Sequence, residues 1–271
     1  KFTPDGLRRA KRLKFIGHAA GSVVAVVHED VFDAGITVTN ANKPLAQSTA
    51  EAAVAFMLAG AWRLKHYASR LQAGGWSDNH NETVLGLQGK TVGLIGYGEI
   101  SRHVIRLLQG FQVHFLLYSR HCSAEEAAAL GAELCSLEEL LARSDIVSLH
   151  STWTPRTEGM IGRSELRRIR DGAVFVNTAR AAIVEEDALL EELRTGRFSA
   201  VLDVYHQEPP AASHPLLQLP NVLCLPHIGG FHHGFKSNLG AFVAQDLLRF
   251  TLGQPCLGAI TKETYRRLTP K

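Results

Sequence analysis

Six short apolar runs between residues 91 and 226 are the feature that most constrains the fold of this chain. They are apolar at successive positions, not at alternate ones, which is typical of strands buried on both faces of a parallel sheet covered by helices. Helix-like segments separate most of them, and two of these segments open with capping boxes, at Ser123-x-x-Glu126 and Ser136-x-x-Glu139. The alternation predicts an α/β fold with a doubly wound parallel sheet. The runs are "TVGLIG" (91–96), "VHFLLY" (113–118), "DIVSLH" (145–150), "AVFVN" (173–177), "SAVLD" (199–203) and "VLCLP" (222–226).

The two ends of the chain have a different pattern. Residues 13–40 hold one or two strands, in "LKFIG" and "GITVTN", and a long alanine-rich helix is expected from the capping box Ser48-x-x-Glu51 to about Leu71. Another long helix is expected over 234–252. We therefore expect the sheet domain at 73–232, with 1–72 and 233–271 forming a second, smaller, discontinuous α/β domain.

Composition narrows the classes of protein. With 271 residues, 45% of them hydrophobic and 20% charged, the chain can bury one large core or two smaller ones. A net charge of +3 is too small to indicate nucleic-acid binding, but it is compatible with a small anionic ligand. No apolar stretch is long enough to span a bilayer, and the opening segment lacks a signal-peptide core. We expect a cytoplasmic protein with no membrane and no nucleic-acid partner.

The four cysteines and the histidines do not indicate a metal site. Cys122, Cys135, Cys224 and Cys256 lie far apart, which favours reduced thiols over a zinc ribbon or a disulfide framework. His232 and His233 follow His227 closely, but their spacing fits no compact zinc pattern. No metal is expected.

A glycine-rich turn follows the first run. Gly96-x-Gly98-x-x-Ser101 stands between a predicted strand and a predicted helix. In a βαβ unit the first glycine permits the tight turn, and the second lets the backbone approach a pyrophosphate at the helix N-terminus. A lone Gly-x-Gly can also be a structural turn, but the surrounding strands favour a dinucleotide site.

The second strand of such a unit ends beside the adenosine ribose. An Asp or Glu there accepts hydrogen bonds from the ribose hydroxyls of NAD. Here the strand ends in Tyr118-Ser119-Arg120-His121, and a serine hydroxyl with a guanidinium can bind a 2′-phosphate. The sequence favours NADP as the cofactor, with NAD possible if Arg120 stacks on adenine or points to water.

Polar residues come directly after the later strands, where ligands of open α/β sheets gather. They are His150 with Thr152, the segment 177–180, Asp203 and His227. Reduction of a 2-oxo acid needs a cation for the carboxylate and a proton donor for the carbonyl oxygen. Arg180 suits the first role because its planar fork can hold both groups.

His227 suits the second role because imidazole changes charge near neutral pH. Glu208, in "DVYHQEPP", is a candidate for the carboxylate that orients the ring. Each residue alone has a simpler reading: a surface ion pair for Arg180, a strand-end cap for His227, and a solvated loop residue for Glu208. Their combination beside a dinucleotide site favours catalysis.

At this point the sequence resembles the D-isomer-specific 2-hydroxyacid dehydrogenases, with the glyoxylate and hydroxypyruvate reductases as the most similar members. The resemblance runs from about Leu13 to Thr264. It rests on "GKTVGLIGYGEI", "SLHSTWTPRTEGMIG", "GAVFVNTARAAIVEEDALLEEL", "LDVYHQEPP" and "LPNVLCLPHIGG".

The resemblance implies roles for individual positions. It makes Arg180 the group that binds the substrate carboxylate and carbonyl, His227 the acid–base and Glu208 its partner. It also implies a second carboxylate site at the backbone of Ala20 and Gly21, and a contact between Asp203 and the nicotinamide carboxamide. The other positions where the family lines its cofactor site are Gly96, Gly98, Glu99, Ile100, Thr152, Thr157, Thr178, Ala179 and Gly229.

Some features depart from the family pattern. Ala181 and Ser101 replace two glycines, and Ser22 falls where the family more often has Val before Asp. Members usually carry several tens of residues before the "LKFIG" strand, so the sequence reads as a homologue without most of that segment.

The resemblance also implies a homodimer built on the nucleotide domains, with Trp62 and Trp76 as core or subunit-contact residues. The expected activity is NADPH-preferring reduction of small 2-oxo acids to D-2-hydroxy acids. The alternatives are a dinucleotide-sensing protein of the corepressor type and an inactive truncated homologue.

Overall fold

A computed structural model describes residues 1–76, 84–266 and 268. The chain forms two compact units. The sheet unit comprises Thr49–Ser151 and Arg156–Gly229, and the terminal unit comprises Lys1–Ser48, Thr152–Pro155 and Gly230–Lys271.

The unit boundaries differ from those expected at 72/73 and 232/233. The first one falls inside helix α3 (Asn42–Ala61). The later half of this helix buries Ala53 and Met57 in the core of the sheet unit. The apolar face of this half of the helix packs on the sheet, so this half belongs to the sheet unit. The sheet unit therefore begins at Thr49 and not at the expected residue 73.

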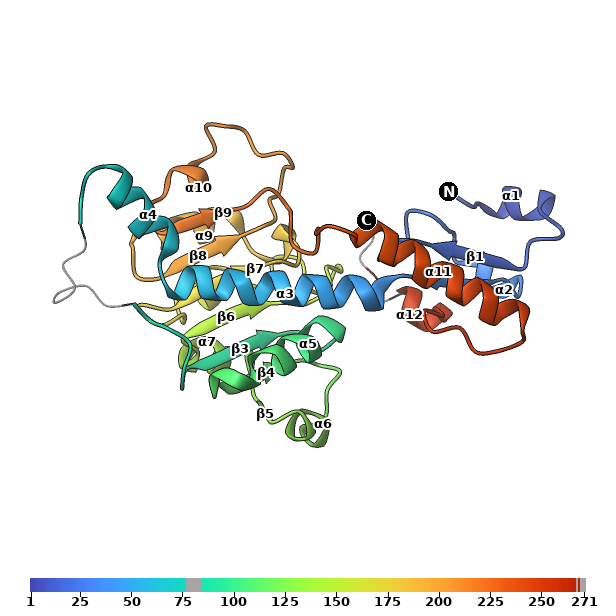
Figure 1. The fold of residues 1–271 in the computed structure, drawn as a ribbon, viewed down its shortest axis with the longest axis horizontal. Coiled ribbons are helices and arrows are strands. Elements are labelled where there is room, and N and C mark those ends of the chain that lie inside the picture. Colours follow the sequence, from blue (N-terminus) through green and yellow to red (C-terminus); the bar gives the residue numbers. More distant parts are fainter. Residues whose placement is uncertain (77–83, 267, 269–271) are drawn as a thin grey trace. The chain divides into compact units, whose positions relative to one another are not determined.

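The sheet unit holds seven parallel strands in the order β5-β4-β3-β6-β7-β8-β9 (Figure 1). The strand order reverses between β3 and β6, where an open α/β sheet has its topological switch point. Six of the strands coincide with the six apolar runs. The seventh strand, β5, was not expected, because its three residues carry a central glutamate and form no apolar run. The strands are β3 (Thr91–Ile95), β4 (His114–Tyr118), β5 (Ala132–Leu134), β6 (Ile146–Leu149), β7 (Val174–Asn177), β8 (Ser199–Leu202) and β9 (Val222–Cys224).

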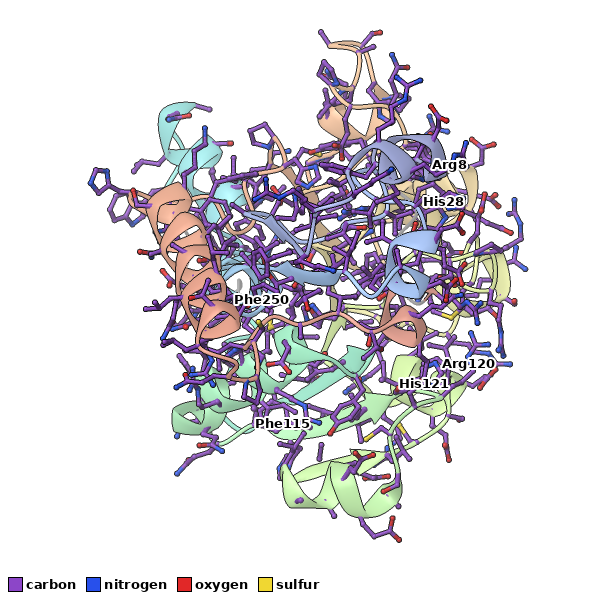
Figure 2. All side chains as sticks on the ribbon, turned by 90° about the vertical axis from the view of Figure 1, so that its right-hand side faces the viewer. Arg8, His28, Phe115, Arg120, His121 and Phe250 are labelled. Atoms are coloured by element: carbon purple, nitrogen blue, oxygen red, sulfur yellow. The ribbon has the colours of Figure 1, made fainter. Side chains whose placement is uncertain are left out.

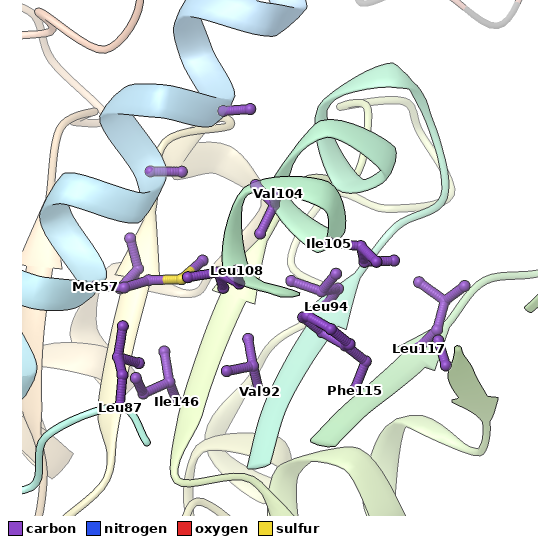
Figure 3. Packing of buried hydrophobic residues seen from close by; sticks show 14 of the residues in the cluster. Met57, Leu87, Val92, Leu94, Val104, Ile105, Leu108, Phe115, Leu117 and Ile146 are labelled. Carbon is purple, nitrogen blue, oxygen red and sulfur yellow. The ribbon is translucent and has the colours of Figure 1, made fainter. Parts of the chain in front are cut away.

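Helices cover both faces of this sheet. On one face, Val92 and Leu94 of β3 pack in a cluster with Met57 of α3 and Leu108 of α5 (Figure 3). On the other, α7 lies so close to β3 that a Cβ on Gly93 would stand 2.5 Å from Leu140 Cδ2. The expected doubly wound sheet is therefore confirmed. The helices of this unit after α3 are α4 (Leu64–Gln72), α5 (Glu99–Leu108), α6 (Ala124–Ala129), α7 (Leu137–Arg143), α8 (Arg163–Leu166), α9 (Glu186–Arg194) and α10 (Pro215–Gln218), with 3₁₀ turns η1 (Gln109–Phe111) and η2 (Ala181–Ile183).

Local capping explains where the helices begin. Two of the three expected capping boxes form, at Ser123 with Glu126 and at Ser136 with Glu139. The third expectation was wrong, because α3 begins at Asn42 and Ser48 lies inside it. Asn40 Oδ1 accepts a hydrogen bond from the Asn42 N–H at 3.2 Å, and a proline follows two residues later, in the first turn, where the missing N–H costs nothing.

The long helix also ends earlier than expected. It stops at Ala61, and α4 begins at Leu64 after Arg63 adopts a left-handed conformation with φ 50°. The segment expected as one helix to about Leu71 is therefore two.

The terminal unit is a smaller α/β assembly. Its strands β1 (Phe15–His18) and β2 (Thr37–Asn40) are parallel, and its core includes Ile16, Val38 and Tyr265. Within the described ranges, no helix is both long and apolar enough to cross a bilayer. The other elements of this unit are α1 (Pro4–Arg9), α2 (Asp30–Asp33), α11 (Phe235–Thr251) and α12 (Lys262–Arg266).

Candidate active site

The glycine turn lies at the switch point of the sheet, directly after β3. Gly96 has φ 112°, and a Cβ there would stand 2.7 Å from Ser151 N and 2.8 Å from the carbonyl carbon of His150. Only glycine fits this close approach of two strand ends. Gly98 is extended and precedes the first turn of α5, whose first N–H groups have no partner within the helix and can bind an anion. Glu99 and Ile100 are the residues of that first turn.

Ser101 takes the position of the third glycine without leaving a polar group unpaired. Its side chain is fully buried, and its hydroxyl donates to the carbonyl oxygen of Gly96 at 2.7 Å. The serine therefore ties the helix to the turn, which explains in physical terms why this departure from the three-glycine pattern is tolerated.

The residues expected to contact the adenosine ribose lie at the end of β4. Ser119 Oγ accepts a hydrogen bond from the His121 N–H at 3.1 Å, which closes a tight turn. Arg120 is exposed beside His121 (Figure 2), and its guanidinium lies 3.9 Å from Met160 Sδ. The turn thus presents a hydroxyl and an exposed cation, and no carboxylate stands within it.

Arg180 follows β7 in a loop that Asn177 holds in place. Asn177 Oδ1 accepts from the Ala179 N–H at 3.0 Å, and its Nδ2 donates to the Arg180 carbonyl at 3.2 Å. The guanidinium is partly buried and donates to the Ala179 carbonyl at 2.7 Å. Burial lowers the pKa of Arg180, and the negative charge of Glu208 opposes that shift. Arginine remains a cation at neutral pH in any case.

His227 and Glu208 form a hydrogen-bonded pair, with 2.7 Å between His227 Nδ1 and Glu208 Oε2. The other carboxylate oxygen, Oε1, accepts from the Tyr205 N–H at 3.0 Å. Burial alone would raise the pKa of Glu208, but the hydrogen bonds from His227 and Tyr205 and the charge of Arg180 outweigh it, and the net shift is downward. An ionised carboxylate on Nδ1 fixes the ring and leaves Nε2 for a substrate.

The backbone around His227 is strained and is held from the next strand. His227 has φ 52°, a left-handed conformation that costs about 1–3 kcal/mol for a residue of this kind. The Asp203 carboxylate accepts the two following N–H groups, Ile228 at 2.8 Å and Gly229 at 2.7 Å. Burial raises the pKa of Asp203, and these two hydrogen bonds oppose the rise. Asp203 therefore holds the loop that carries the imidazole.

Tyr205 is a site residue that the sequence did not reveal. Besides its backbone bond to Glu208, its hydroxyl lies 2.8 Å from the Leu225 carbonyl and 3.1 Å from the Leu202 carbonyl. Burial raises the pKa of this phenol well above its usual value. Its role depends on how β8 and β9 end beside each other, and no local pattern signals that.

The remaining expected residues divide between the units. Thr178, Ala179, Thr157 and Gly229 belong to the sheet unit, and a Cβ on Gly229 would lie 2.6 Å from Asp203 Oδ2. Ala20, Gly21 and Thr152 belong to the terminal unit, where Asn40 Nδ2 donates to the Gly21 carbonyl at 2.6 Å. Their part in the site stays a prediction.

His232, which follows His227 closely, has hydrogen-bond partners within the terminal unit. His232 Nε2 lies 2.8 Å from Ser48 Oγ, and its Nδ1 lies 2.6 Å from the His233 carbonyl. In the part of the chain that the structure describes, no group of three His, Cys, Asp or Glu side chains could hold a metal ion.

The strand order, the glycine turn at the switch point and the polar strand ends define a Rossmann-type dinucleotide-binding domain. Residues 54–229 match the family model described as "D-isomer specific 2-hydroxyacid dehydrogenase, NAD binding domain". The chain belongs to the D-isomer-specific 2-hydroxyacid dehydrogenase family, as the sequence motifs indicated.

Three relatives illustrate the similarity. A D-3-phosphoglycerate dehydrogenase of Archaeoglobus fulgidus is 34% identical over 261 residues, which are 96% of this chain and 49% of that protein. The chain thus spans about half the length of this relative. A glyoxylate reductase of Thermococcus litoralis is 33% identical over 277 residues, covering 100% of this chain and 83% of that one. The crystal structure of a glyoxylate reductase from Paecilomyes thermophila superposes with a TM-score of 0.78 at 31% identity, covering 93% of this chain and 76% of that one.

The left-handed conformation of His227 leads to a testable prediction about stability. His227→Gly and His227→Ala both remove the bond to Glu208, but only glycine relaxes the strain at φ 52°. We expect the glycine variant to be more stable than the alanine variant by about 1 kcal/mol in urea unfolding, although glycine usually destabilises. Equal stability, or a more stable alanine variant, would show that the loop carries no strain.

Proposed function

We propose that this protein reduces small 2-oxo acids to D-2-hydroxy acids with NADPH or NADH. The observation that carries the proposal is the His227–Glu208 pair at the carboxyl edge of a dinucleotide-binding sheet, with the charge of Arg180 acting on the same carboxylate. The names of the relatives support it, because they include glyoxylate reductases.

The residues of the sheet unit have the chemistry that such a reaction needs. The nicotinamide cofactor supplies the hydride to the carbonyl carbon. Arg180 holds the substrate carboxylate and polarises the carbonyl with its planar pair of N–H donors. His227 Nε2 delivers a proton to the carbonyl oxygen, and Glu208 stabilises the imidazolium before that transfer. In the reverse direction His227 takes the hydroxyl proton.

The residues at the glycine turn fit a dinucleotide. A side chain on Gly96 would fill the space between the ends of β3 and β6, and the N-terminus of α5 faces the turn with free N–H groups. A dinucleotide-sensing corepressor remains a second reading of the same fold, but the relatives carry the names of dehydrogenases and reductases.

The acid–base assignment predicts a large loss of turnover on removal of the imidazole. With glyoxylate, hydroxypyruvate and larger 2-oxo acids as a panel, His227→Ala should lower kcat by about 10²–10⁴-fold, the usual contribution of a positioned general acid. NADPH or NADH oxidation at 340 nm measures the rate. The control is His103→Ala, a partly exposed histidine of α5 that contacts Arg106. Normal turnover without His227 would overturn the mechanism.

We infer that the cofactor preference is for NADPH. The support is the Ser119–Arg120 turn at the end of β4, where a 2′-phosphate would meet a hydroxyl and an exposed guanidinium. NADH lacks that phosphate and gains nothing from the cation.

Arg120→Ala tests the preference directly. Because a hydrogen bond to a charged group contributes about 1.5–3 kcal/mol, the Kd of NADPH should rise about 10- to 100-fold, and that of NADH less than about twofold. Fluorescence titration of both cofactors measures the two effects, and Arg106→Ala, on the solvent side of α5, is the control. An equal effect on both cofactors would refute the preference.

We also propose that the protein is a homodimer. The support is the apolar surface on and around α4, where Leu71 is 58% exposed and Trp76 is 77% exposed. A pocket of about 310 Å³, lined in part by Ala59, Val201 and Leu223, lies in the same unit. Apolar surface of this kind on a folded domain is typical of a protein interface.

A charge placed on this surface should separate the subunits. Leu71 is exposed in the single chain, so Leu71→Glu should leave the fold intact. It should lower the sedimentation coefficient from that of a dimer to that of a monomer. Leu107→Glu, an exposed position on α5, is the matched control. If the unmodified chain sediments as a monomer at micromolar concentration, the proposal is contradicted.

A further inference from the structure

The strained residue His227 is held by hydrogen bonds on both of its sides in the chain. After it, the Asp203 carboxylate accepts the next two N–H groups. Before it, the His227 N–H itself donates to the Leu225 carbonyl oxygen at 3.1 Å, across Pro226. A three-residue turn of this kind depends on the direction of that one carbonyl. Whatever fixes the Leu225 carbonyl therefore also acts on the position of the imidazole.

The Tyr205 hydroxyl is a second donor to that carbonyl. It lies 2.8 Å from the Leu225 oxygen and 3.1 Å from the Leu202 oxygen. The Leu225 N–H in turn donates to the Leu202 carbonyl at 2.9 Å. The tyrosine is only 8% exposed, so water does not compete for these bonds. The phenol thus joins the end of β8 to the segment after β9, and it fixes the direction of the Leu225 carbonyl.

The backbone of the same tyrosine contacts the other member of the acid–base pair. The Tyr205 N–H donates to Glu208 Oε1 at 3.0 Å. The other carboxylate oxygen, Oε2, lies 2.7 Å from His227 Nδ1. One residue therefore holds the carboxylate directly and the imidazole through the Leu225 carbonyl, so it influences the distance between them from both ends.

The phenol is suited to holding the loop and not to transferring a proton. Burial and the neighbouring Cys224 thiol raise the pKa of Tyr205 well above its usual value, so the hydroxyl keeps its proton near neutral pH. Both oxygens beside it belong to backbone carbonyls, which only accept hydrogen bonds. The hydroxyl is therefore a constant donor to the backbone.

We propose that the Tyr205 hydroxyl is a positioning group for the pair of His227 and Glu208. The proposal rests on the proposed function, since it gives the position of that pair its importance for turnover. A phenylalanine would fill the same space but would remove one donor from the Leu225 carbonyl. His227 would then be freer to leave its left-handed conformation, because such a conformation persists only where the surrounding structure holds it.

Tyr205→Phe tests the proposal, because it removes the hydroxyl and keeps both the ring and the backbone bond to Glu208. The kcat for reduction of 2-oxo acids should fall about 3- to 10-fold, which corresponds to the loss of one hydrogen bond. The KM values for the oxo acid and the cofactor should stay within about twofold, because the phenol holds neither Arg180 nor the glycine turn. Steady-state rates with the panel of 2-oxo acids measure these constants.

Tyr265→Phe is the matched control. Tyr265 belongs to the terminal unit, is 9% exposed, and donates from its hydroxyl to the Val27 carbonyl at 3.0 Å. Each variant loses one buried bond from a phenol to a carbonyl, so both should lower the melting temperature by a similar amount, about 2–4 °C. Only Tyr205→Phe should lower kcat. Equal losses of kcat in the two variants would indicate a general loosening of the fold and would overturn the proposal.

A double-mutant cycle tests whether the hydroxyl acts through the imidazole. In a chain that carries His227→Ala, no ring remains to be positioned. Adding Tyr205→Phe should therefore change the residual kcat by less than about twofold. If the two losses multiply instead, the hydroxyl acts independently of His227, and the proposal is wrong.

A spectroscopic signal reports the position of the ring without turnover. In protein labelled with ¹⁵N-histidine, the ring signals that are absent from His227→Ala belong to His227. Tyr205→Phe should shift the Nδ1 signal, because the bond to Glu208 becomes longer or less populated, and Tyr265→Phe should leave it in place.

The outcomes separate the positioning role from the proposed function. If the unmodified chain reduces no 2-oxo acid of the panel, the proposed function fails and the role of Tyr205 in turnover fails with it. If the unmodified chain is active and Tyr205→Phe keeps its kcat and its Nδ1 signal, only the positioning role is overturned. A lower kcat together with a shifted Nδ1 signal, in this variant and not in Tyr265→Phe, supports both.

Discussion

The bond between the Asp203 carboxylate and the two N–H groups after His227 is the constraint on which the rest of the site depends. It fixes the loop after β9 to the end of β8 and holds His227 in a left-handed conformation that an unsupported chain would leave. Glu208 can then meet Nδ1 at 2.7 Å. Because Asp203 is buried and its pKa is raised, its ionised form depends on those same N–H donors, so loop geometry and charge support each other.

The parallel ladder extends this constraint to the other strands. The Asp203 N–H donates to the Asn177 carbonyl at 3.1 Å, and the Asn177 side chain in turn holds the loop that carries Arg180. Residues separated by 20 to 50 positions in sequence thus lie on neighbouring strands, which are about 4.8 Å apart. This is why polar residues directly after successive strands converge, although none of them is close to another in the chain.

The same regularity explains what could be predicted from sequence and what could not. Strand ends follow from apolar runs, so the positions of Gly96, Asp203 and the segment after β7 were predictable, as were the helices with capping boxes. The start of α3 was not predictable, because Ser48-x-x-Glu51 has the sequence of a capping box but lies inside the helix. The helix begins at Asn42, whose N–H donates to the Asn40 side chain. The unit boundary, the function of Tyr205 and the pairing of Ser101 with Gly96 depend on tertiary contacts, which no local pattern encodes.

Two histidines past the strand ends show how one side chain type acquires two chemistries. His227 has a carboxylate at hydrogen-bond distance and a half-exposed ring, an environment that orients the ring and leaves Nε2 for a substrate. His150 has both ring nitrogens buried and without a hydrogen-bond partner among the described residues. Burial lowers its pKa to about 4, so the charged form is disfavoured at neutral pH.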